Sequence, residues 1–420
     1  MASQVKPHAG SIANTEPNIR DVQHTTAAIV GGGPAGAVLA LLLARKGIPV
    51  TLLESHMDFD RDFRGDTIHP AVMELLDELG LAQRLLELRH TKLKSATLPT
   101  PRGPLTLAPF RRLKTRFPYI TMLPQADFLR FVTDEAGRYP NFRLAMGARV
   151  EQLVMEHGVV RGVRYQSPDG WHELRATLTF GADGRFSRLR KLAGLAAIKT
   201  SPPMDVLWFR LPRKLGEGED IMGRFGNGHM LIMLNRQETW QAAFVILKAS
   251  YGKLHAAGLP ALRQAIAELM PEFADRVEHL QDWKQISLLS VESDRLQRWY
   301  QPGLLLIGDA AHVMSPVGGV GINYAIQDAV VAANILTQPL KAGNVQLRHL
   351  RSVQRRREWP VRIVQALQSL GQRRIVANAL NPGKTFRVPE LLQILSRVPV
   401  LRDLPGRFLA YGVWPVHLQP

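Results

Sequence analysis

The sequence contains no cysteine among its 420 residues. This absence excludes disulfide bonds, thiolate catalysis and iron–sulfur ligation, and it fits a reducing compartment. Long apolar runs are also missing: the longest, residues 35–44, is far shorter than the roughly 20 residues that a bilayer-spanning helix needs. Residues 1–24 are polar and lack the apolar core of a secretory signal. We therefore expect a disordered tail at residues 1–24 and a cytoplasmic protein.

Acidic residues are outnumbered, with 36 Asp and Glu against 53 Lys and Arg, which gives a net charge of +17. Most of the excess lies in residues 341–420, where 14 Lys and Arg and 3 acids leave a net charge of +11. Apolar residues recur there at helical spacing, which predicts amphipathic helices with basic outer faces. Since aromatic residues for stacking bases are sparse in this region, we expect no nucleic acid partner.

The basic helices have two possible roles, capping the rest of the fold or docking on an anionic membrane surface. A surface anchor works better as one uninterrupted amphipathic helix, and prolines interrupt this region. We favour capping for that reason, and the prolines concerned are Pro382, Pro389, Pro399 and Pro405.

A strand–turn–helix–strand pattern near the N-terminus indicates a dinucleotide-binding fold. The apolar run at residues 26–30 enters the motif Gly31-x-Gly33-x-x-Gly36, and an Ala/Leu-rich helix follows. Gly31 permits a tight turn, Gly33 lets the backbone approach a pyrophosphate, and Gly36 lets the helix pack closely on the strand. The helix N-terminus offers N–H groups and the positive end of a dipole. Glu54, 18 residues past Gly36, ends the next strand, where an acid can bind an adenosine ribose.

Two later motifs again place an acid after an apolar strand. Residues 178–181 precede Asp183-Gly184, and residues 304–307 precede Gly308-Asp309 and a glycine-rich turn that begins a long helix. Ligands of open α/β sheets bind at the carboxyl ends of the strands. A buried acid there needs a partner, and a ligand hydroxyl is a suitable one. For His312 we expect a structural role and not that of a base.

These three motifs, in this order and at these separations, resemble the class A flavoprotein monooxygenases, the FAD-dependent aromatic hydroxylases of the para-hydroxybenzoate hydroxylase type. The resemblance covers roughly residues 25–336. It implies one non-covalently bound FAD, NAD(P)H as a transient co-substrate, and a flavin-ring segment with catalytic contacts at Pro316 and Gly321 but no assigned protein base. The residues that it places on the cofactor are Gly31, Gly33, Pro34, Ala35, Gly36, Glu54, Arg64, Gln125, Asp183, Gly308, Asp309, Gly319, Gly321, Ile322 and Asn323.

The fold implied is α/β: a Rossmann-like FAD-binding domain with an interleaved β-sheet substrate domain of α+β type and a C-terminal helical region. We expect the FAD-binding domain at residues 25–200 and 291–340, with 93–123 contributing to the substrate lobe. The substrate domain is expected at 201–290 and the basic helical region at 341–420. Local patterns predict helices over 70–79, 126–137, 260–269 and 324–336, a hairpin over 144–166 and a strand over 284–291.

Bulky apolar residues alternate in the expected substrate domain, which predicts a sheet with one face toward the flavin. Met and aromatic residues also fill ordinary cores, so each of these residues has a purely structural alternative. The substrate-contact candidates are Trp208, Met222, Phe225, Met233 and Trp240, with His229, Met230 and Phe244 nearby.

The resemblance implies a monooxygenase that uses NAD(P)H and O2 to hydroxylate a small aromatic or otherwise electron-rich molecule through a flavin C4a-hydroperoxide. Two alternatives stay open: an FAD-dependent reductase or desaturase acting on a quinone or isoprenoid at a membrane surface, and a non-enzymatic binding protein on the same fold. Retention of Glu54, Asp183 and Asp309 argues against the binding protein. The sequence contains no metal-site motif, no Walker A motif and no Trp-x-Trp signature of flavin halogenases. It leaves the substrate, the choice of NADH or NADPH and the oligomeric state undetermined.

Overall fold

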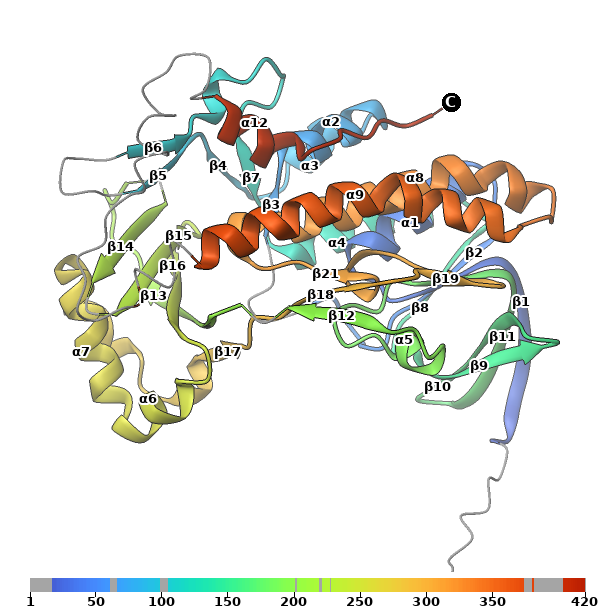
Figure 1. The fold of residues 1–420 in the computed structure, drawn as a ribbon, viewed down its shortest axis with the longest axis horizontal. Coiled ribbons are helices and arrows are strands. Elements are labelled where there is room, and N and C mark those ends of the chain that lie inside the picture. The colour runs from blue at the N-terminus through green and yellow to red at the C-terminus, as the bar shows by residue number, and fades with distance from the viewer. Residues whose placement is uncertain are drawn as a thin grey trace, which may run out of the picture.

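The computed structural model describes residues 17–60, 66–98, 105–200, 202–218, 221–226, 228–373, 380 and 403–419. Its largest sheet has the strand order β19-β20-β11-β1-β2-β8, with β10 and β9 added beside β11 (Figure 1). The strands from β20 to β8 run parallel. They are β1 (Ile19–Val30), β2 (Val50–Leu53), β8 (Phe142–Ala145), β9 (Arg149–Glu156), β10 (Val159–Ser167), β11 (Gly170–Gly181), β19 (Tyr300–Gln301) and β20 (Leu304–Leu306).

Strand β1 begins at Ile19, so the predicted disordered tail is wrong for residues 19–24. This outer half of β1 pairs with the equally long β11, from Ile19 opposite Trp171 to His24 opposite Arg175. Its side chains are mostly exposed or half-buried, because the pairing extends beyond the covering helices. Without a buried face, the segment carries no apolar pattern that a sequence reading could detect. Residues 1–16 lie outside the described part of the chain.

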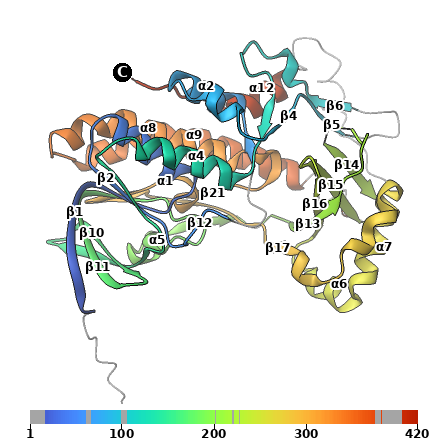
Figure 2. The same cartoon turned by 180° about the vertical axis from the view of Figure 1, so that it is seen from behind.

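Four helices cover one face of the large sheet, and Figures 1 and 2 show them stacked along it. Helix α1 is buried almost all round because α4 and α8 both pack against it. Helix α8 is longer than the predicted segment 324–336, since it begins at Gly321 and continues to Lys341. The four helices are α1 (Pro34–Arg45), α4 (Gln125–Gly137), α8 (Gly321–Lys341) and α9 (Leu347–Gly371).

A second, antiparallel sheet has the order β14-β15-β16-β13-β17 and forms a separate lobe with helices α6 and α7 (Figure 1). Its strand β17 is shorter than the predicted strand 284–291, because residues 283–285 form a 3-10 turn capped by Asp282. We propose to retain residues 201–290 as the substrate domain. Its elements are β13 (Met204–Pro212), β14 (Met222–Gly226), β15 (His229–Asn235), β16 (Thr239–Leu247), α6 (Tyr251–Ala257), α7 (Leu259–Leu269) and β17 (Ser287–Leu289).

Short strands join the two lobes. The sheet β12-β18-β21 lies between them (Figure 1), and an apolar cluster packs Leu93, Phe110 and Ile120 against Leu234 of β15. The shorter elements are β3 (Thr67–Ile68), α2 (Pro70–Glu78), α3 (Ala82–Leu86), β4 (Thr91–Leu93), β5 (Ala96–Leu98), β6 (Leu105–Ala108), β7 (Ile120–Met122), α5 (Arg188–Leu192), β12 (Ala197–Thr200), β18 (Ser293–Leu296), β21 (His312–Val313) and α12 (Leu404–Tyr411).

The predicted helices at 70–79, 126–137 and 260–269 are confirmed as α2, α4 and α7 within one residue at each end. The predicted hairpin is confirmed as β9–β10, and the two residues of its turn, His157 and Gly158, both have positive φ angles. Positive φ angles at both turn residues are typical of two-residue hairpins, because the twist of such a turn matches that of the flanking strands.

Helix α9 begins the basic C-terminal region and has one apolar and one basic face. Leu350, Val353, Val361 and Val364 are buried in the main core, which is the arrangement that capping predicts. The opposite face is exposed and carries several arginines together with apolar residues such as Trp359. Of the four prolines that favoured capping, those at positions 382, 389 and 399 lie outside the described residues.

In the described part of the chain, no helix combines the length and the apolar character that crossing a membrane requires.

Candidate functional site

The strand register brings the ends of all three sequence motifs to one edge of the large sheet. Val30 lies opposite Leu53 on one side and Gly181 on the other, and Gly181 lies opposite Leu306. Backbone hydrogen bonds continue past the strand ends, from Ala182 N to Val30 O at 2.7 Å and from Ile307 N to Gly181 O at 2.9 Å. The glycine loop and the acids that follow these strands therefore share the carboxyl edge, where open α/β sheets bind ligands.

The three glycines of the loop have different surroundings. Gly31 has φ +104°, and a Cβ on it would lie 2.4 Å from the carbonyl oxygen of Ala182. A Cβ on Gly36 would lie 1.9 Å from the carbonyl oxygen of Gly31, whereas a Cβ on Gly33 would meet no atom within 4 Å. The first and third glycines are thus required by the packing of the protein itself.

Gly33 is also the N-cap of α1, and Pro34 and Ala35 form the first turn of this helix. Since glycine has no side chain to cap the helix, its first N–H groups are available to an anion. The open space at Gly33 and the helix N-terminus together fit the pyrophosphate of FAD.

Glu54 follows β2 and is buried beside the glycine loop. Its Oε2 accepts a hydrogen bond from the N–H of Gly32 at 2.9 Å, and its Oε1 accepts one from the N–H of His56 at 2.9 Å. These contacts fix the carboxylate at the end of the strand, next to the loop that would hold the adenosine part of FAD.

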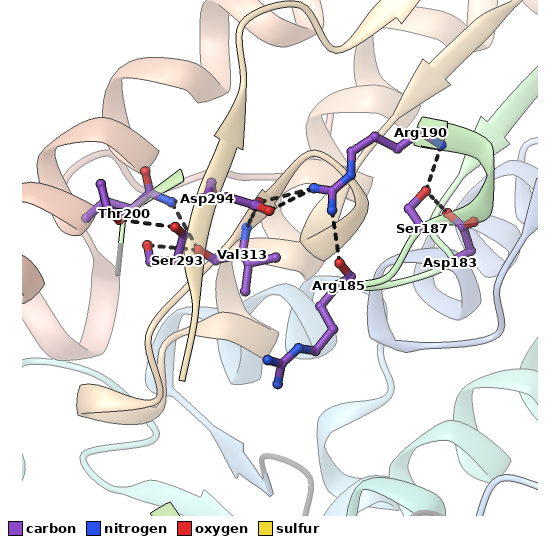
Figure 3. Close-up of polar contacts among 9 residues, drawn as sticks. Asp183, Arg185, Ser187, Arg190, Thr200, Ser293, Asp294 and Val313 are labelled. Carbon is purple, nitrogen blue, oxygen red and sulfur yellow. Dashed lines mark hydrogen bonds and ion pairs between the residues drawn. The ribbon is translucent and has the colours of Figure 1, made fainter. Parts of the chain in front are cut away.

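Asp183 shapes the turn after β11 (Figure 3). Its carboxylate accepts hydrogen bonds from Ser187 Oγ at 2.6 Å and from the N–H of Leu189 at 3.0 Å, and Ser187 caps α5 by accepting from the N–H of Arg190. Burial raises the pKa of Asp183 above its ordinary value, although these hydrogen bonds oppose the shift. The carboxylate thus stabilises the turn, and its contact with the cofactor stays a proposal.

Arg190 links this turn to the strands between the lobes, as Figure 3 shows. Its Nη1 donates to Asp294 Oδ2 of β18 at 3.0 Å, and its Nη2 donates to the carbonyl oxygen of Arg185 at 3.1 Å. Asp294 also accepts from the N–H of Val313 in β21 at 3.3 Å. No local sequence pattern predicts this network, because 104 residues separate Arg190 from Asp294.

A buried ion-pair cluster lies behind the Gly308-Asp309 turn. Asp328 of α8 accepts hydrogen bonds from the N–H of Gly308 at 3.0 Å, from His312 Nε2 at 2.6 Å and from Arg357 Nε of α9 at 2.7 Å. Burial would raise the pKa of Asp328, but electrostatic attraction and hydrogen bonds from His312 and Arg357 lower it below its ordinary value. The ionised carboxylate therefore holds the backbone of Gly308, while Asp309 lies partly exposed at the sheet edge.

The cluster decides the position of His312 as well. Its ring is buried, bonds Asp328 and packs on the ring of Trp299 with centroids 4.9 Å apart. This placement agrees with the structural role expected for His312. Asp328 and Arg357 were not among the predicted site residues, although an acid and an arginine within apolar helix faces are an unusual signal in the sequence.

The segment that resembles the flavin-ring contact begins at Pro316 and leads through a 3-10 turn into α8 at Gly321. The side chain of Asn323 donates to the carbonyl oxygens of Thr67 and Gly319, both at 3.3 Å, and accepts from the N–H of His69 at 2.9 Å. Thr67 Oγ1 donates to the Gly319 carbonyl oxygen at 2.9 Å. These bonds tie β3 to the segment, so Gly319 and Asn323 also have structural roles.

Ile322 is half-buried beside this segment, and Gln125 begins α4 with its N–H donating to Asp66 Oδ1 at 3.0 Å. Arg64 lies outside the described residues. Among the residues that the structure describes, no group of three or more His, Asp or Glu side chains could hold a metal ion.

His69 supports the same region and gives a pH-dependent prediction. It is buried, donates from Nδ1 to the carbonyl oxygen of Leu409 in α12 at 2.6 Å, and burial lowers its pKa from 6.5 to about 4. In the unfolded chain His69 is protonated below about pH 6.5, whereas in the folded chain it stays neutral down to about pH 4. The stability of the fold is therefore unaffected by His69 above pH 6.5 and decreases as the pH falls from 6.5 to 4. We expect His69 to remove on the order of 3 kcal/mol of stability by pH 4.

Urea unfolding of the protein and of His69→Gln at pH 7 and pH 5 measures this effect. The variant is expected to lose less stability between the two pH values than the unchanged protein, because glutamine does not titrate. Equal losses in the two proteins would contradict the assigned role of His69.

The substrate-contact candidates divide between the two faces of the second sheet. Trp208 and Phe225 lie on the face that forms a cluster with Met230 and Val291. Met233 and Trp240 are fully buried on the other face, in the core of the lobe against α7. Met222 and Phe244 also pack in that core, and the ring of His229 lies tilted against that of Phe244 with centroids 4.8 Å apart.

This division follows from strand geometry, since successive side chains point to opposite faces of a sheet. The indole N–H of Trp240 donates to Glu217 at 2.6 Å within the lobe. The indole N–H of Trp208 is buried and has no hydrogen-bond partner among the described residues. We therefore retain Trp208 and Phe225 as substrate-contact candidates, and assign Met222, Met233 and Trp240 to the packing of the lobe.

Comparison with known proteins agrees with this geometry. Residues 24–366 match the FAD binding domain family, and the chain belongs to the FAD-dependent aromatic monooxygenases, the class A flavoprotein hydroxylases. It is 34% identical over 394 residues to the 6-methylpretetramide 4-monooxygenase of Streptomyces rimosus, covering 93% of each chain. The predicted monooxygenase activity, with FAD as cofactor and NAD(P)H as co-substrate, is confirmed.

Other relatives are longer or more distant. The chain is 28% identical over 317 residues to the 12-dehydrotetracycline 5-monooxygenase/anhydrotetracycline 6-monooxygenase of Streptomyces rimosus, covering 72% of this chain and 60% of that one. Among solved structures, the OxyS anhydrotetracycline hydroxylase from Streptomyces rimosus superposes with a TM-score of 0.74 at 24% identity, covering 92% of this chain and 76% of that one. At this identity the superposition supports the fold alone, and the predicted α/β fold is confirmed.

Proposed function

We propose that the enzyme hydroxylates 6-methylpretetramide or a closely related fused-ring aromatic compound. The observation that carries the proposal is the end-to-end similarity to the 6-methylpretetramide 4-monooxygenase, which covers 93% of both chains. A match of this extent includes the substrate lobe and most of the C-terminal region as well as the FAD-binding motifs.

The residues at the sheet edge supply binding and orientation. Gly33 and the N-terminus of α1 would hold the pyrophosphate, Glu54 the adenosine ribose and Asp309 the ribityl chain. The N-terminus of α8 at Gly321 would place N–H groups and a positive dipole end beside negative charge on the flavin ring. When bound, FAD would supply the redox chemistry, which is the transfer of electrons from NAD(P)H to O2.

The substrate lobe would close the other side of the site. Trp208 and Phe225 share the face that we propose to lie toward the aromatic substrate, and aromatic side chains there can stack on a flat ring system. A buried N–H without a partner is costly, so a carbonyl or hydroxyl oxygen of the substrate is a fitting acceptor for the Trp208 indole.

The test is an assay of NAD(P)H oxidation and O2 consumption with 6-methylpretetramide, followed by mass spectrometry of the product. We expect substrate to stimulate NAD(P)H oxidation and to gain one oxygen atom. Trp208→Phe should raise KM by about 2- to 13-fold, the range set by one lost hydrogen bond. Oxidation that no fused-ring aromatic stimulates, or that yields only hydrogen peroxide, would refute the proposed substrate class.

A further inference from the structure

The turn between β15 and β16 reaches from the substrate lobe to the FAD-binding lobe. Arg236, the first residue after β15, forms an ion pair through Nη2 with Asp66 Oδ2, 170 residues away in the sequence. Both side chains are only 14% exposed. Arg236 Nε also donates to Gln241 Oε1 of β16 at 2.7 Å, which fixes the guanidinium to its own sheet.

Asp66 is connected to two segments that the family resemblance places on the cofactor. Its Oδ1 accepts from the N–H of Gln125 at the start of α4, at 3.0 Å. The next residue, Thr67, donates from Oγ1 to the carbonyl oxygen of Gly319 at 2.9 Å, and its own carbonyl oxygen accepts from Asn323 at 3.3 Å. One carboxylate therefore joins the substrate-lobe turn to α4 and, through β3, to the flavin-ring segment.

The electrostatics of the pair indicate a role in geometry more than in stability. Burial raises the pKa of Asp66 and lowers that of Arg236, and the attraction between the two groups opposes both shifts. Taking both charges out of water offsets much of their attraction, so a buried pair adds little net stability compared with apolar packing. What the pair provides is a directed contact of fixed geometry, which apolar packing does not supply.

We propose that Arg236 is a positioning residue for the flavin-dependent reaction: through Asp66 it holds strand β3 and the N-terminus of α4 in the arrangement that orients the flavin ring. The inference rests on the proposed function, which places the N-terminus of α8 beside the flavin ring, and on the family resemblance, which implies that Gln125 and the Gly319–Asn323 segment contact the cofactor. Since Arg236 belongs to the substrate lobe, its contact with Asp66 makes the position of the flavin-ring segment depend on the position of that lobe.

The same turn supplies a matched control. Glu238 forms an interlobe ion pair with Arg89 at 2.8 Å, but these side chains are 79% and 69% exposed and neither touches Asp66. Exposed pairs contribute little to stability. Arg89→Met therefore removes a contact between the lobes without disturbing the connection to β3 and α4.

The experiment compares Arg236→Met, Asp66→Asn and Arg89→Met with the unchanged protein. The first readout is the FAD dissociation constant of the apoprotein together with the absorbance spectrum of the bound flavin, neither of which needs a substrate. The second readout is the fraction of NAD(P)H oxidation that produces hydrogen peroxide in place of hydroxylated product. Thermal unfolding of each apoprotein separates misfolding from misplacement.

We expect Arg236→Met and Asp66→Asn to weaken FAD binding about tenfold and to raise the peroxide fraction severalfold, because small displacements at a reacting centre have large kinetic costs. Arg89→Met should stay within about twofold of the unchanged protein. The double variant of Arg236→Met and Asp66→Asn should be no worse than either single variant, since both remove one interaction. Arg236→Lys keeps the charge but loses the bond to Gln241, so its FAD affinity and peroxide fraction should lie between those of Arg236→Met and the unchanged protein.

Equal FAD dissociation constants and equal peroxide fractions in Arg236→Met and Arg89→Met would overturn the inference. Arg236 would then be only one of several contacts between the lobes. If Arg236→Met does not fold, Asp66→Asn and Arg236→Lys decide the question by the same two readouts. Failure of the unchanged protein to hydroxylate any fused-ring aromatic would refute the proposed substrate and leave the flavin-binding comparison intact.

Discussion

Arg357→Met is expected to lower the free energy of unfolding by about 3–5 kcal/mol, the usual cost of removing one partner of a buried ion pair. The substitution leaves the carboxylate of Asp328 in the core, where the side chains of Asp328 and Arg357 are 0% and 1% exposed. Because Asp328 also holds the N–H of Gly308, we expect FAD affinity to fall together with stability. Urea unfolding of the apoprotein and FAD titration measure the two effects.

Arg355→Met is the matched control, since Arg355 lies on the exposed face of the same helix. It should change stability by no more than about 0.5 kcal/mol. Combining Arg357→Met with Asp328→Asn should cost less than the sum of the single changes, because the second change removes a buried charge that has already lost one of its partners. A loss in Arg357→Met no larger than in Arg355→Met would refute the role of the pair.

Asp309→Ala is expected to weaken FAD binding by about 1.5–3 kcal/mol, or roughly 10- to 150-fold in the dissociation constant. The reason is loss of a charge-assisted hydrogen bond to a ribityl hydroxyl, which the position of Asp309 at the carboxyl edge of β20 makes possible. Titration of the apoprotein with FAD, followed by flavin fluorescence, measures the change. Any remaining hydroxylation rate at saturating FAD should fall less than the affinity.

Asp309→Asn keeps the size of the side chain, and its FAD affinity should lie between those of Asp309→Ala and the unchanged protein. Asp134→Ala, on the exposed face of α4, should leave FAD affinity unchanged. An Asp309→Ala protein that is purified with its full flavin content would show that the acid does not bind the cofactor.

Local signals were enough for the FAD-binding motifs. The neighbour that excludes a side chain at Gly36 is the carbonyl oxygen of Gly31 in the same motif, whereas the neighbour of Gly31 is Ala182, which follows β11 in the second motif. Helices such as α2 and α4 were found because a half-buried helix repeats its apolar residues with the helical period. Strand β1 beyond its buried half was missed, since a segment paired only through its backbone needs no such pattern.

The substrate lobe shows where sequence patterns stop. Alternation correctly indicated strands, but it cannot say which of two apolar faces meets a neighbouring helix and which meets the other lobe. The packing of α7 decides this, and it places Met233 and Trp240 in the core while Trp208 lies on the other face.

The sequence by itself determined the α/β class, the FAD-binding motifs and the monooxygenase family, because each depends on glycines, acids and apolar residues close together along the chain. Only the tertiary structure decided which charges are paired. The Arg236–Asp66 and Arg357–Asp328 contacts join residues that are 170 and 29 positions apart. Their partners come from other elements of the fold, and burial makes such pairs specific because an unpaired charge in the core is costly.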